Sequence, residues 1–308
     1  MRILIELPTW LGDTVMATPA IENIVNYFIN VEITLIGSFV AIEALKNHPK
    51  VIKTYVLDKN YINLYKTIKS LDEFEMLISF RSSYRSKFIK FCISSKRKYQ
   101  FNKNKFIKGH QVEKYNHFID NVINITSIPG KLILNPQKKT KDSKNKLLGI
   151  NPGASYGSAK RWYPKEFADV ASDLSGHYDI VIFGGSNEKD IALDIEKYLI
   201  KKGVTNYQNL SAKTSITELI SQIANLDLFI TGDSGPMHLA AAYQIPTVAI
   251  FGPTNDKETS QWMNEKSIIV KKNLECQPCM KRACPLKHHK CMKLIEASDV
   301  LRAVKKFN

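Results

Sequence analysis

Short apolar runs alternate with helix-like stretches along the chain, and the alternation restarts after one polar segment. It opens with a β-like run at 2–7, a loop at 8–13 and an apolar-periodic helix that reaches Phe28. Regular alternation of this kind is typical of a mostly parallel sheet covered by helices, so we expect an α/β fold. The next predicted elements are strands at 33–37, 51–57 and 76–79 and helices at 39–47 and 61–69.

The polar segment divides the chain. Residues 135–146, NPQKKTKDSKNK, contain no large apolar side chain to anchor in a core, which predicts an exposed linker. A chain of 308 residues is also long for a single core. We therefore expect two domains, 1–140 and 141–308, with a cleft between them. Beyond the linker the predicted strands are 147–151, 179–183, 204–207, 226–231 and 247–251, and the predicted helices are 164–174, 188–200, 216–224 and 237–243.

The chain is strongly basic, with 44 Lys and Arg against 29 Asp and Glu. Residues 1–146 hold 24 basic and 12 acidic side chains, against 20 and 17 in the rest. The segment 81–108 alone has ten Lys or Arg and no acidic residue. Such a surface attracts nucleic acid, phosphates or an anionic membrane face, although a merely solvated, lysine-rich surface is the open alternative.

Nothing in the sequence indicates export or a membrane span. The opening MRILIELPTW is too short and too polar for a signal-peptide core. The longest uncharged stretch, 234–255, contains three prolines and is typical of a helix, a turn and a buried strand. Five cysteines, four of them within 276–291, are too few to staple a secreted fold of this size. We expect a cytoplasmic protein without a transmembrane segment.

Three loops follow predicted strands and precede helices, where open α/β sheets place their ligands. The first, PTWLGDTVMATPA, carries Asp13, which is either a plain helix N-cap or a general base. The second, NPGASYGSAKRWYPKEF, is a flexible, donor-rich turn that contains Ser155 and Lys160 and suits phosphate.

The third loop, TGDSGPMHLAAA, is the strongest anion-binding signal of the three. A strand ends at Asp233, Ser234 and Gly235, and a small-residue helix begins directly afterwards. The N–H groups and the positive dipole end of such a helix would hold an anion. His238, one turn further, is either another phosphate donor or a satisfied, half-buried helix histidine.

Together with the late segment CQPCMKRACPLKHHKCM, these loops resemble glycosyltransferase family 9, the lipopolysaccharide heptosyltransferases, and follow its heptosyltransferase II pattern in order and spacing. The resemblance implies the GT-B architecture, in which one Rossmann-like domain holds the acceptor and the C-terminal one holds ADP-heptose. The implied reaction is the inverting transfer of L-glycero-D-manno-heptose onto an inner-core heptose of lipopolysaccharide or lipooligosaccharide.

The resemblance also assigns roles to residues. Asp13 matches the family's proposed catalytic base and Lys160 its phosphate-binding lysine. The other donor-binding residues carried over are Ser155, Glu188, Asp233, Ser234, Gly235 and His238. The resemblance implies that no cofactor and no metal bound by Asp-x-Asp is required, and the chain has no such motif. Lysine and backbone N–H groups would take over the role of the metal.

The basic first half supplies the expected acceptor side. Arg81, Arg85 and Lys87 are the predicted early contacts to a phosphorylated, Kdo- and heptose-bearing lipid A precursor. The same half would face the anionic inner surface of the bacterial inner membrane, so the protein is expected to be peripheral there.

Three alternatives stay open. The cysteines Cys276, Cys279, Cys284 and Cys291 read C-x2-C-x4-C-x6-C, which could hold a structural zinc, or they are reduced thiols that pack an irregular loop.

The enzyme could be another GT-B transferase, including heptosyltransferase I or III, or an epimerase that uses a different nucleotide sugar. A nucleic-acid-binding protein is the alternative from another class, and its stacking aromatics would be Tyr84, Phe88, Phe91, Tyr99 and Phe101.

Overall fold

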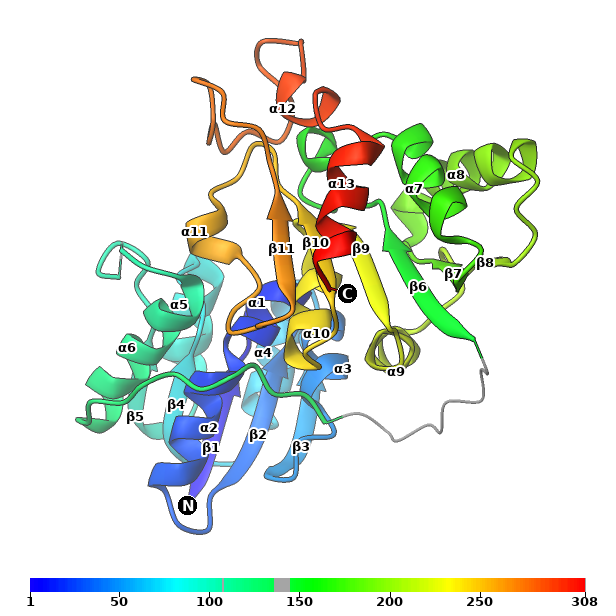
Figure 1. Ribbon diagram of the computed structural model, residues 1–308. Coiled ribbons are helices and arrows are strands. Elements are labelled where there is room, and N and C mark those ends of the chain that lie inside the picture. The colour runs from blue at the N-terminus through cyan, green and yellow to red at the C-terminus, as the bar shows by residue number, and fades with distance from the viewer. Residues whose placement is uncertain (107, 136–144, 308) are drawn as a thin grey trace. The chain divides into compact units, whose positions relative to one another are not determined.

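The computed structural model describes residues 1–106, 108–135 and 145–307. The chain divides into two compact units, Met1–Asn135 and Pro136–Asn308. Each unit is built on its own parallel sheet with helices packed against it (Figure 1). The expected boundary at 140 and most of the expected linker at 135–146 lie outside the described residues.

The first unit contains a five-stranded sheet in the order β3-β2-β1-β4-β5. Its strands are β1 (Arg2–Glu6), β2 (Glu32–Gly37), β3 (Val51–Val56), β4 (Phe74–Ser79) and β5 (Ser95–Gln100). The chain runs from β1 outward to β3 and then returns to the other side of β1, so the strand order reverses between β1 and β4. Their carboxyl ends are the place where a sheet of this kind binds ligands.

Six helices cover this sheet: α1 (Leu11–Met16), α2 (Thr18–Tyr27), α3 (Phe39–Leu45), α4 (Tyr61–Lys69), α5 (Tyr84–Cys92) and α6 (Gln111–Ile123). The single helix predicted to reach Phe28 is wrong, because it breaks at Ala17 and restarts with Pro19 in the first turn of α2. Proline cannot donate a hydrogen bond to the preceding turn, which explains the restart.

The second unit contains a six-stranded sheet in the order β11-β10-β9-β6-β7-β8. Its strands are β6 (Lys146–Asn151), β7 (Tyr178–Ile182), β8 (Tyr207–Asn209), β9 (Leu228–Gly232), β10 (Thr247–Ile250) and β11 (Ser267–Val270). The order reverses between β6 and β9, where Asn151 lies beside Thr231. The strand expected at 204–207 begins only at Tyr207, since Val204 and Thr205 lie in an irregular segment between the preceding helix and the strand.

The helices of this unit are α7 (Pro164–Leu174), α8 (Lys189–Lys201), α9 (Ile216–Ala224), α10 (Gly235–Ala242), α11 (Asp256–Thr259), α12 (Lys290–Lys293) and α13 (Ala297–Val304). Three single-turn 3-10 segments add Ser158–Lys160, Ser186–Glu188 and Lys305–Phe307. The core joins Trp162 and Phe167, whose rings meet edge to face, to the apolar sides of α7, α8 and α13. Within the described residues, no helix has the length and apolar character needed to cross a membrane.

Candidate active site

Asp13 lies at the strand-order reversal of the first unit, in the first turn of α1. The N-cap of α1 is Trp10, which makes no side-chain capping bond, so the plain N-cap alternative for Asp13 is wrong. Asp13 is half-buried and faces Tyr115 of α6 closely enough to affect its titration. Burial raises the pKa of Tyr115 well above its usual value, and the Asp13 carboxylate raises it further.

A second carboxylate, Glu6, ends the buried strand β1 and was not predicted as a site residue. Its side chain is fully buried and accepts hydrogen bonds from Ser79 Oγ at 2.6 Å and Ser86 Oγ at 2.8 Å. Burial raises the pKa of Glu6, and the two serine hydroxyls partly offset this effect. Arg81 Nη1 lies 3.4 Å from Glu6 Oε1, so this buried carboxylate fixes one of the predicted acceptor contacts.

The three predicted acceptor contacts have different surroundings. Arg81, whose side chain is one-fifth exposed, lies at the carboxyl end of β4, beside Glu6. Arg85 donates to the backbone carbonyls of Asp58 and Lys59 and lies over the Tyr61 ring. Lys87 is exposed on α5. Arg81 is therefore the one placed at the strand-order reversal, and the acceptor role of all three stays a prediction.

In the second unit the fold brings Lys160 and Asp233 together. Lys160 Nζ lies 2.5 Å from Asp233 Oδ2, and it also donates to the backbone carbonyl of Asp233 at 3.3 Å. Thr254 Oγ1 donates to the same carboxylate oxygen at 2.6 Å. Both charged side chains are largely buried, at 12% and 5% exposure. A cation is thus held between the carboxyl ends of β6 and β9, where an anionic ligand would need it.

The start of α10 completes this cluster. Asn151 at the end of β6 donates to Ser234 Oγ at 3.1 Å, which fixes the residue before Gly235. Gly235 and Pro236 open the helix, and His238 is buried in its first turn. A helix that begins in this way presents its positive dipole end and backbone N–H groups toward the strand ends.

Glu188 packs against the loop at 152–163, which connects β6 to α7. Its Oε2 accepts from the Gly185 N–H at 2.8 Å. A side chain on Gly153 would overlap the Glu188 carboxylate, so glycine is required for this close approach. Ser155 is exposed on the same loop. The structure thus gathers six of the seven predicted donor residues after three neighbouring strands, β9, β6 and β7, with Ser155 on the adjoining surface.

The cysteine-containing segment at 276–291 contacts this loop through two backbone carbonyls and one histidine ring. Ala159 N–H donates to the Arg282 carbonyl at 3.0 Å, and the Tyr156 hydroxyl donates to the Met280 carbonyl at 2.7 Å. His289 Nε2 lies 2.9 Å from the Ala159 carbonyl oxygen. A Cβ at Gly157 would overlap the Arg282 backbone. The segment therefore supports the loop that carries Lys160, a role that sequence reasoning missed.

The four late cysteines are free thiols. Burial, assisted by the other three sulfurs, raises the pKa of Cys291 to about 11, which favours the protonated thiol at neutral pH. Across the residues that the structure describes, no three His, Cys, Asp or Glu side chains are grouped so as to hold a metal ion. The zinc alternative therefore gains no support from the arrangement.

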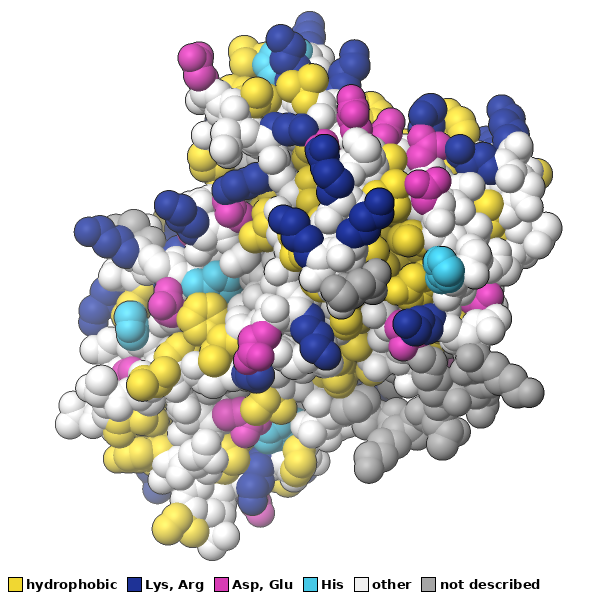
Figure 2. Space-filling model, viewed as in Figure 1, with side chains coloured by type: hydrophobic (Ala, Val, Ile, Leu, Met, Phe, Trp, Pro, Cys, Tyr) yellow, Lys and Arg dark blue, Asp and Glu magenta, His cyan; other side chains and the backbone are white. Residues whose placement is uncertain are grey.

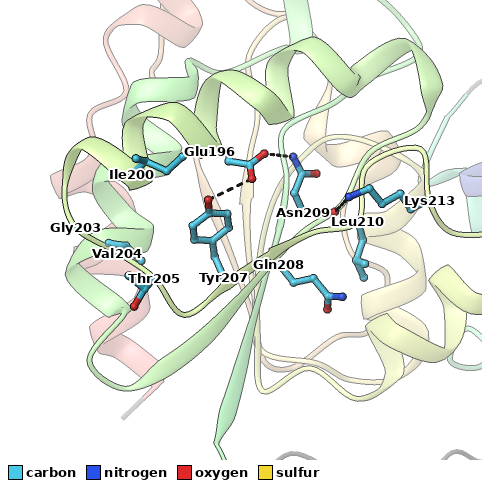
Figure 3. Close-up of a pocket in the computed structure, with 10 residues that line it drawn as sticks. All are labelled: Glu196, Ile200, Gly203, Val204, Thr205, Tyr207, Gln208, Asn209, Leu210 and Lys213. Carbon is cyan, nitrogen blue, oxygen red and sulfur yellow. Dashed lines mark hydrogen bonds between the residues drawn. The ribbon is translucent and has the colours of Figure 1, made fainter.

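A pocket of about 530 Å³ lies elsewhere, between the edge strand β8 and α8. Figure 3 shows the Glu196 carboxylate pointing toward Tyr207 and Asn209, which donate to it at 3.2 Å and 2.9 Å. These polar groups satisfy one another, and none of the predicted donor residues lines the pocket. The chemistry of the Lys160 cluster therefore identifies the candidate site better than cavity volume does.

Comparison with known proteins now places the chain. A model of glycosyltransferase family 9 (heptosyltransferase) matches residues 64–290. The lipooligosaccharide heptosyltransferase 2 of Campylobacter jejuni subsp. jejuni serotype O:2 is 43% identical over 99% of this chain and 98% of its own. The chain belongs to glycosyltransferase family 9. The corresponding protein of serotype O:6 is 42% identical over 100% of this chain and 99% of its own.

Among solved structures, this family 9 chain resembles the E. coli ADP-heptose lipopolysaccharide heptosyltransferase II. The TM-score is 0.80 at 20% identity, covering 99% of this chain and 98% of that one. The predicted α/β fold with two Rossmann-like sheets, the GT-B architecture, is confirmed. The predicted enzyme class, a glycosyltransferase, is confirmed by the family match.

Proposed function

We propose that this family 9 enzyme transfers L-glycero-D-manno-heptose from ADP-heptose onto an inner-core heptose of lipopolysaccharide or lipooligosaccharide, with inversion at the anomeric carbon. The two Campylobacter relatives carry the name lipooligosaccharide heptosyltransferase 2. The observation that carries the proposal is the Lys160–Asp233 pair beside the start of α10, at the strand-order reversal of the second sheet.

The second unit holds the donor in this proposal. Lys160 and the N-terminal N–H groups of α10 bind the diphosphate, and Asp233 accepts from the heptose hydroxyls while it orients Lys160. One carboxylate oxygen of Glu188 accepts from the Gly185 N–H, and the other oxygen accepts from a ribose hydroxyl. As the bond from the anomeric carbon to the phosphate oxygen breaks, its electron pair moves onto the diphosphate. The lysine and the helix end stabilise that growing negative charge.

The first unit holds the acceptor. Asp13 removes the proton from the acceptor hydroxyl as that oxygen attacks the anomeric carbon from the side opposite the leaving diphosphate. A single in-line displacement inverts the anomeric centre and needs one carboxylate base. Arg81, positioned by Glu6, contacts the phosphate or carboxylate groups of the lipid A precursor. The resulting site needs no cofactor, and the enzyme works as a peripheral protein on the inner face of the inner membrane.

Acceptor choice tests the proposal directly. The purified enzyme should transfer heptose from ADP-heptose to heptosyl-Kdo2-lipid A and not to Kdo2-lipid A, as followed by mass spectrometry of the lipid. Transfer to Kdo2-lipid A and not to heptosyl-Kdo2-lipid A would indicate heptosyltransferase I instead. A thermal-shift comparison of ADP with UDP and GDP tests the donor independently, because a preference for UDP or GDP would contradict the ADP-heptose assignment.

A further inference from the structure

Two helices of the first unit, α4 and α5, expose an unusual set of side chains. Both pack on the same side of the sheet through Leu64, Ile68, Ile89 and Ile93. Their opposite sides therefore point away from the core. The exposed apolar, aromatic and lysine side chains of the two helices, called the α4–α5 face below, are Tyr61, Ile62, Tyr65, Lys66 and Lys69 of α4 and Tyr84, Lys87 and Phe91 of α5.

Several apolar and aromatic members of this face are largely exposed. Tyr84 is 85% exposed and Phe91 is 84% exposed, and Ile62 is 66% exposed on the neighbouring helix. Tyr84 and Phe91 are seven residues apart, so they lie on one side of α5. Clustered exposed apolar groups on packed helices mark an interaction surface.

The charge on this face is of one sign. Neither α4 nor α5 contains Asp or Glu. Two acidic residues flank α4 in the sequence: Asp58, which accepts from Asn60 and Asn63, and Asp72, which pairs with Arg2 and Lys53. By contrast, basic and acidic side chains are interspersed over the surface seen in Figure 2. The absence of acidic residues from both helices, combined with the exposed rings, therefore distinguishes the α4–α5 face.

Cations lie over three of the exposed rings. Lys87 Nζ is 4.9 Å from the centre of the Tyr84 ring, and Lys69 Nζ is 5.7 Å from that of Tyr65. The Arg85 guanidinium is 5.5 Å from the Tyr61 ring. Each of these rings is thus already in contact with a cation. Of the aromatics expected to stack bases, Phe101 is buried. Phe88 packs against the buried cluster that contains Leu64 and Ile89.

We propose that the α4–α5 face docks on an anionic lipid bilayer. Tyrosine rings and long apolar side chains partition into the headgroup region, while lysines extend along them to the negatively charged surface. Each lysine near such a surface strengthens binding about fivefold. The inference rests on the proposed function in one respect, since it names the surface through which the enzyme would reach an acceptor embedded in that bilayer.

Co-sedimentation of the full chain with vesicles tests this docking. Vesicles of phosphatidylcholine with phosphatidylglycerol should bind the protein, and pure phosphatidylcholine should bind it at least tenfold more weakly. The charge variant Lys66→Gln/Lys69→Gln should weaken binding on the order of 25-fold. The apolar variant Ile62→Ser/Phe91→Ser should weaken it about tenfold.

Matched variants control for general loss of charge and apolar surface. Lys201 lies over the Tyr198 ring at 5.9 Å, much as Lys69 lies over Tyr65, and Lys257 is exposed. Lys201→Gln/Lys257→Gln should bind like the unchanged protein. So should Ile29→Ser/Ile128→Ser, which removes side chains that are 87% and 91% exposed outside this face.

The outcomes separate the docking surface from the proposed function. With a deacylated, water-soluble acceptor, all variants should transfer heptose at the unchanged rate, whereas with a vesicle-embedded acceptor the α4–α5 variants should be slower. Absence of transfer to either acceptor contradicts the proposed function. The docking surface is then tested by vesicle binding alone. Equal vesicle binding by all variants overturns the inference. Two other results would also overturn it if the unchanged protein does not bind vesicles: binding of single-stranded RNA at about 150 mM salt that the α4–α5 variants lose, or a dimer that they fail to form.

Discussion

The Lys160–Asp233 pair gives the sharpest quantitative expectation. At 2.5 Å and an effective dielectric constant near 20, the attraction is about 7 kcal/mol. Removing two ions from water costs several kcal/mol each, so the intact pair contributes little net stability. Removal of one partner is different, because the other charge stays largely buried, and Asp233 would keep only the Thr254 hydroxyl.

Lys160→Met and Asp233→Asn should therefore each lower the free energy of unfolding by about 3 kcal/mol. The double variant removes both charges and keeps an acceptor for Thr254, so it should lose only about 1 kcal/mol. Urea unfolding followed by tryptophan fluorescence can measure this, since Trp162 is buried two residues from Lys160. ADP affinity should behave differently and remain at least tenfold reduced in the double variant, because the cation is still missing.

The exposed pair Lys197–Asp194, at 2.9 Å and with side chains 70% and 50% exposed, is the control. The corresponding cycle there should give a coupling energy below about 1 kcal/mol. Additive losses in the Lys160/Asp233 cycle would refute the reasoning, because they would mean that neither charge depends on the other. Recovery of ADP binding in the double variant would refute the phosphate role of Lys160.

Three further predictions concern other parts of the two units. Asp13→Asn should lower kcat about 10²–10⁴-fold and leave ADP-heptose affinity within twofold, whereas substantial remaining transfer would contradict its role as base. The raised pKa of Glu6 means that its stabilising contribution is complete below pH 4.5 and is lost as pH rises through the higher folded pKa. Unfolding measurements should therefore show the unchanged protein gaining stability relative to Glu6→Gln as pH falls from 7.5 toward 4.5; a constant difference would contradict this. Gly157→Ala should displace the loop from Arg282 and raise the KM for ADP-heptose about tenfold, while Gly176→Ala, in open space, should change nothing.

The sequence predicts those elements whose signal is local. The buried strands that end near the site are continuous apolar runs, as expected for parallel strands covered on both faces, and β1 and β9 appear close to their predicted limits. Strand β5 was missed because its sequence, SKRKYQ, is charged and lies at the edge of the sheet, where apolar side chains are not required.

The pairing of site residues is not local and could not be read from spacing. Lys160 meets Asp233 because β9 returns to lie beside β6, and Glu6 meets Arg81 because β4 returns beside β1. In each sheet, the pair is brought together by the reversal of strand order in that sheet. A signal for Glu6 was nonetheless present, since a carboxylate at the last position of a buried strand needs partners there.

The cysteine-containing segment shows a different limit of sequence reasoning. Its regular Cys spacing directs attention to sulfur ligands, yet the contacts that join it to the Lys160 loop use the carbonyl oxygens of Met280 and Arg282 and the ring of His289. Any residue type has a carbonyl, so no pattern of side chains in the segment could indicate the bonds to Met280 and Arg282. The signal that remained was Gly157, because a glycine at a point of close backbone approach indicates that another segment packs there. A displacement of the segment would reach Lys160 by way of Ala159, whose N–H and carbonyl oxygen both contact it.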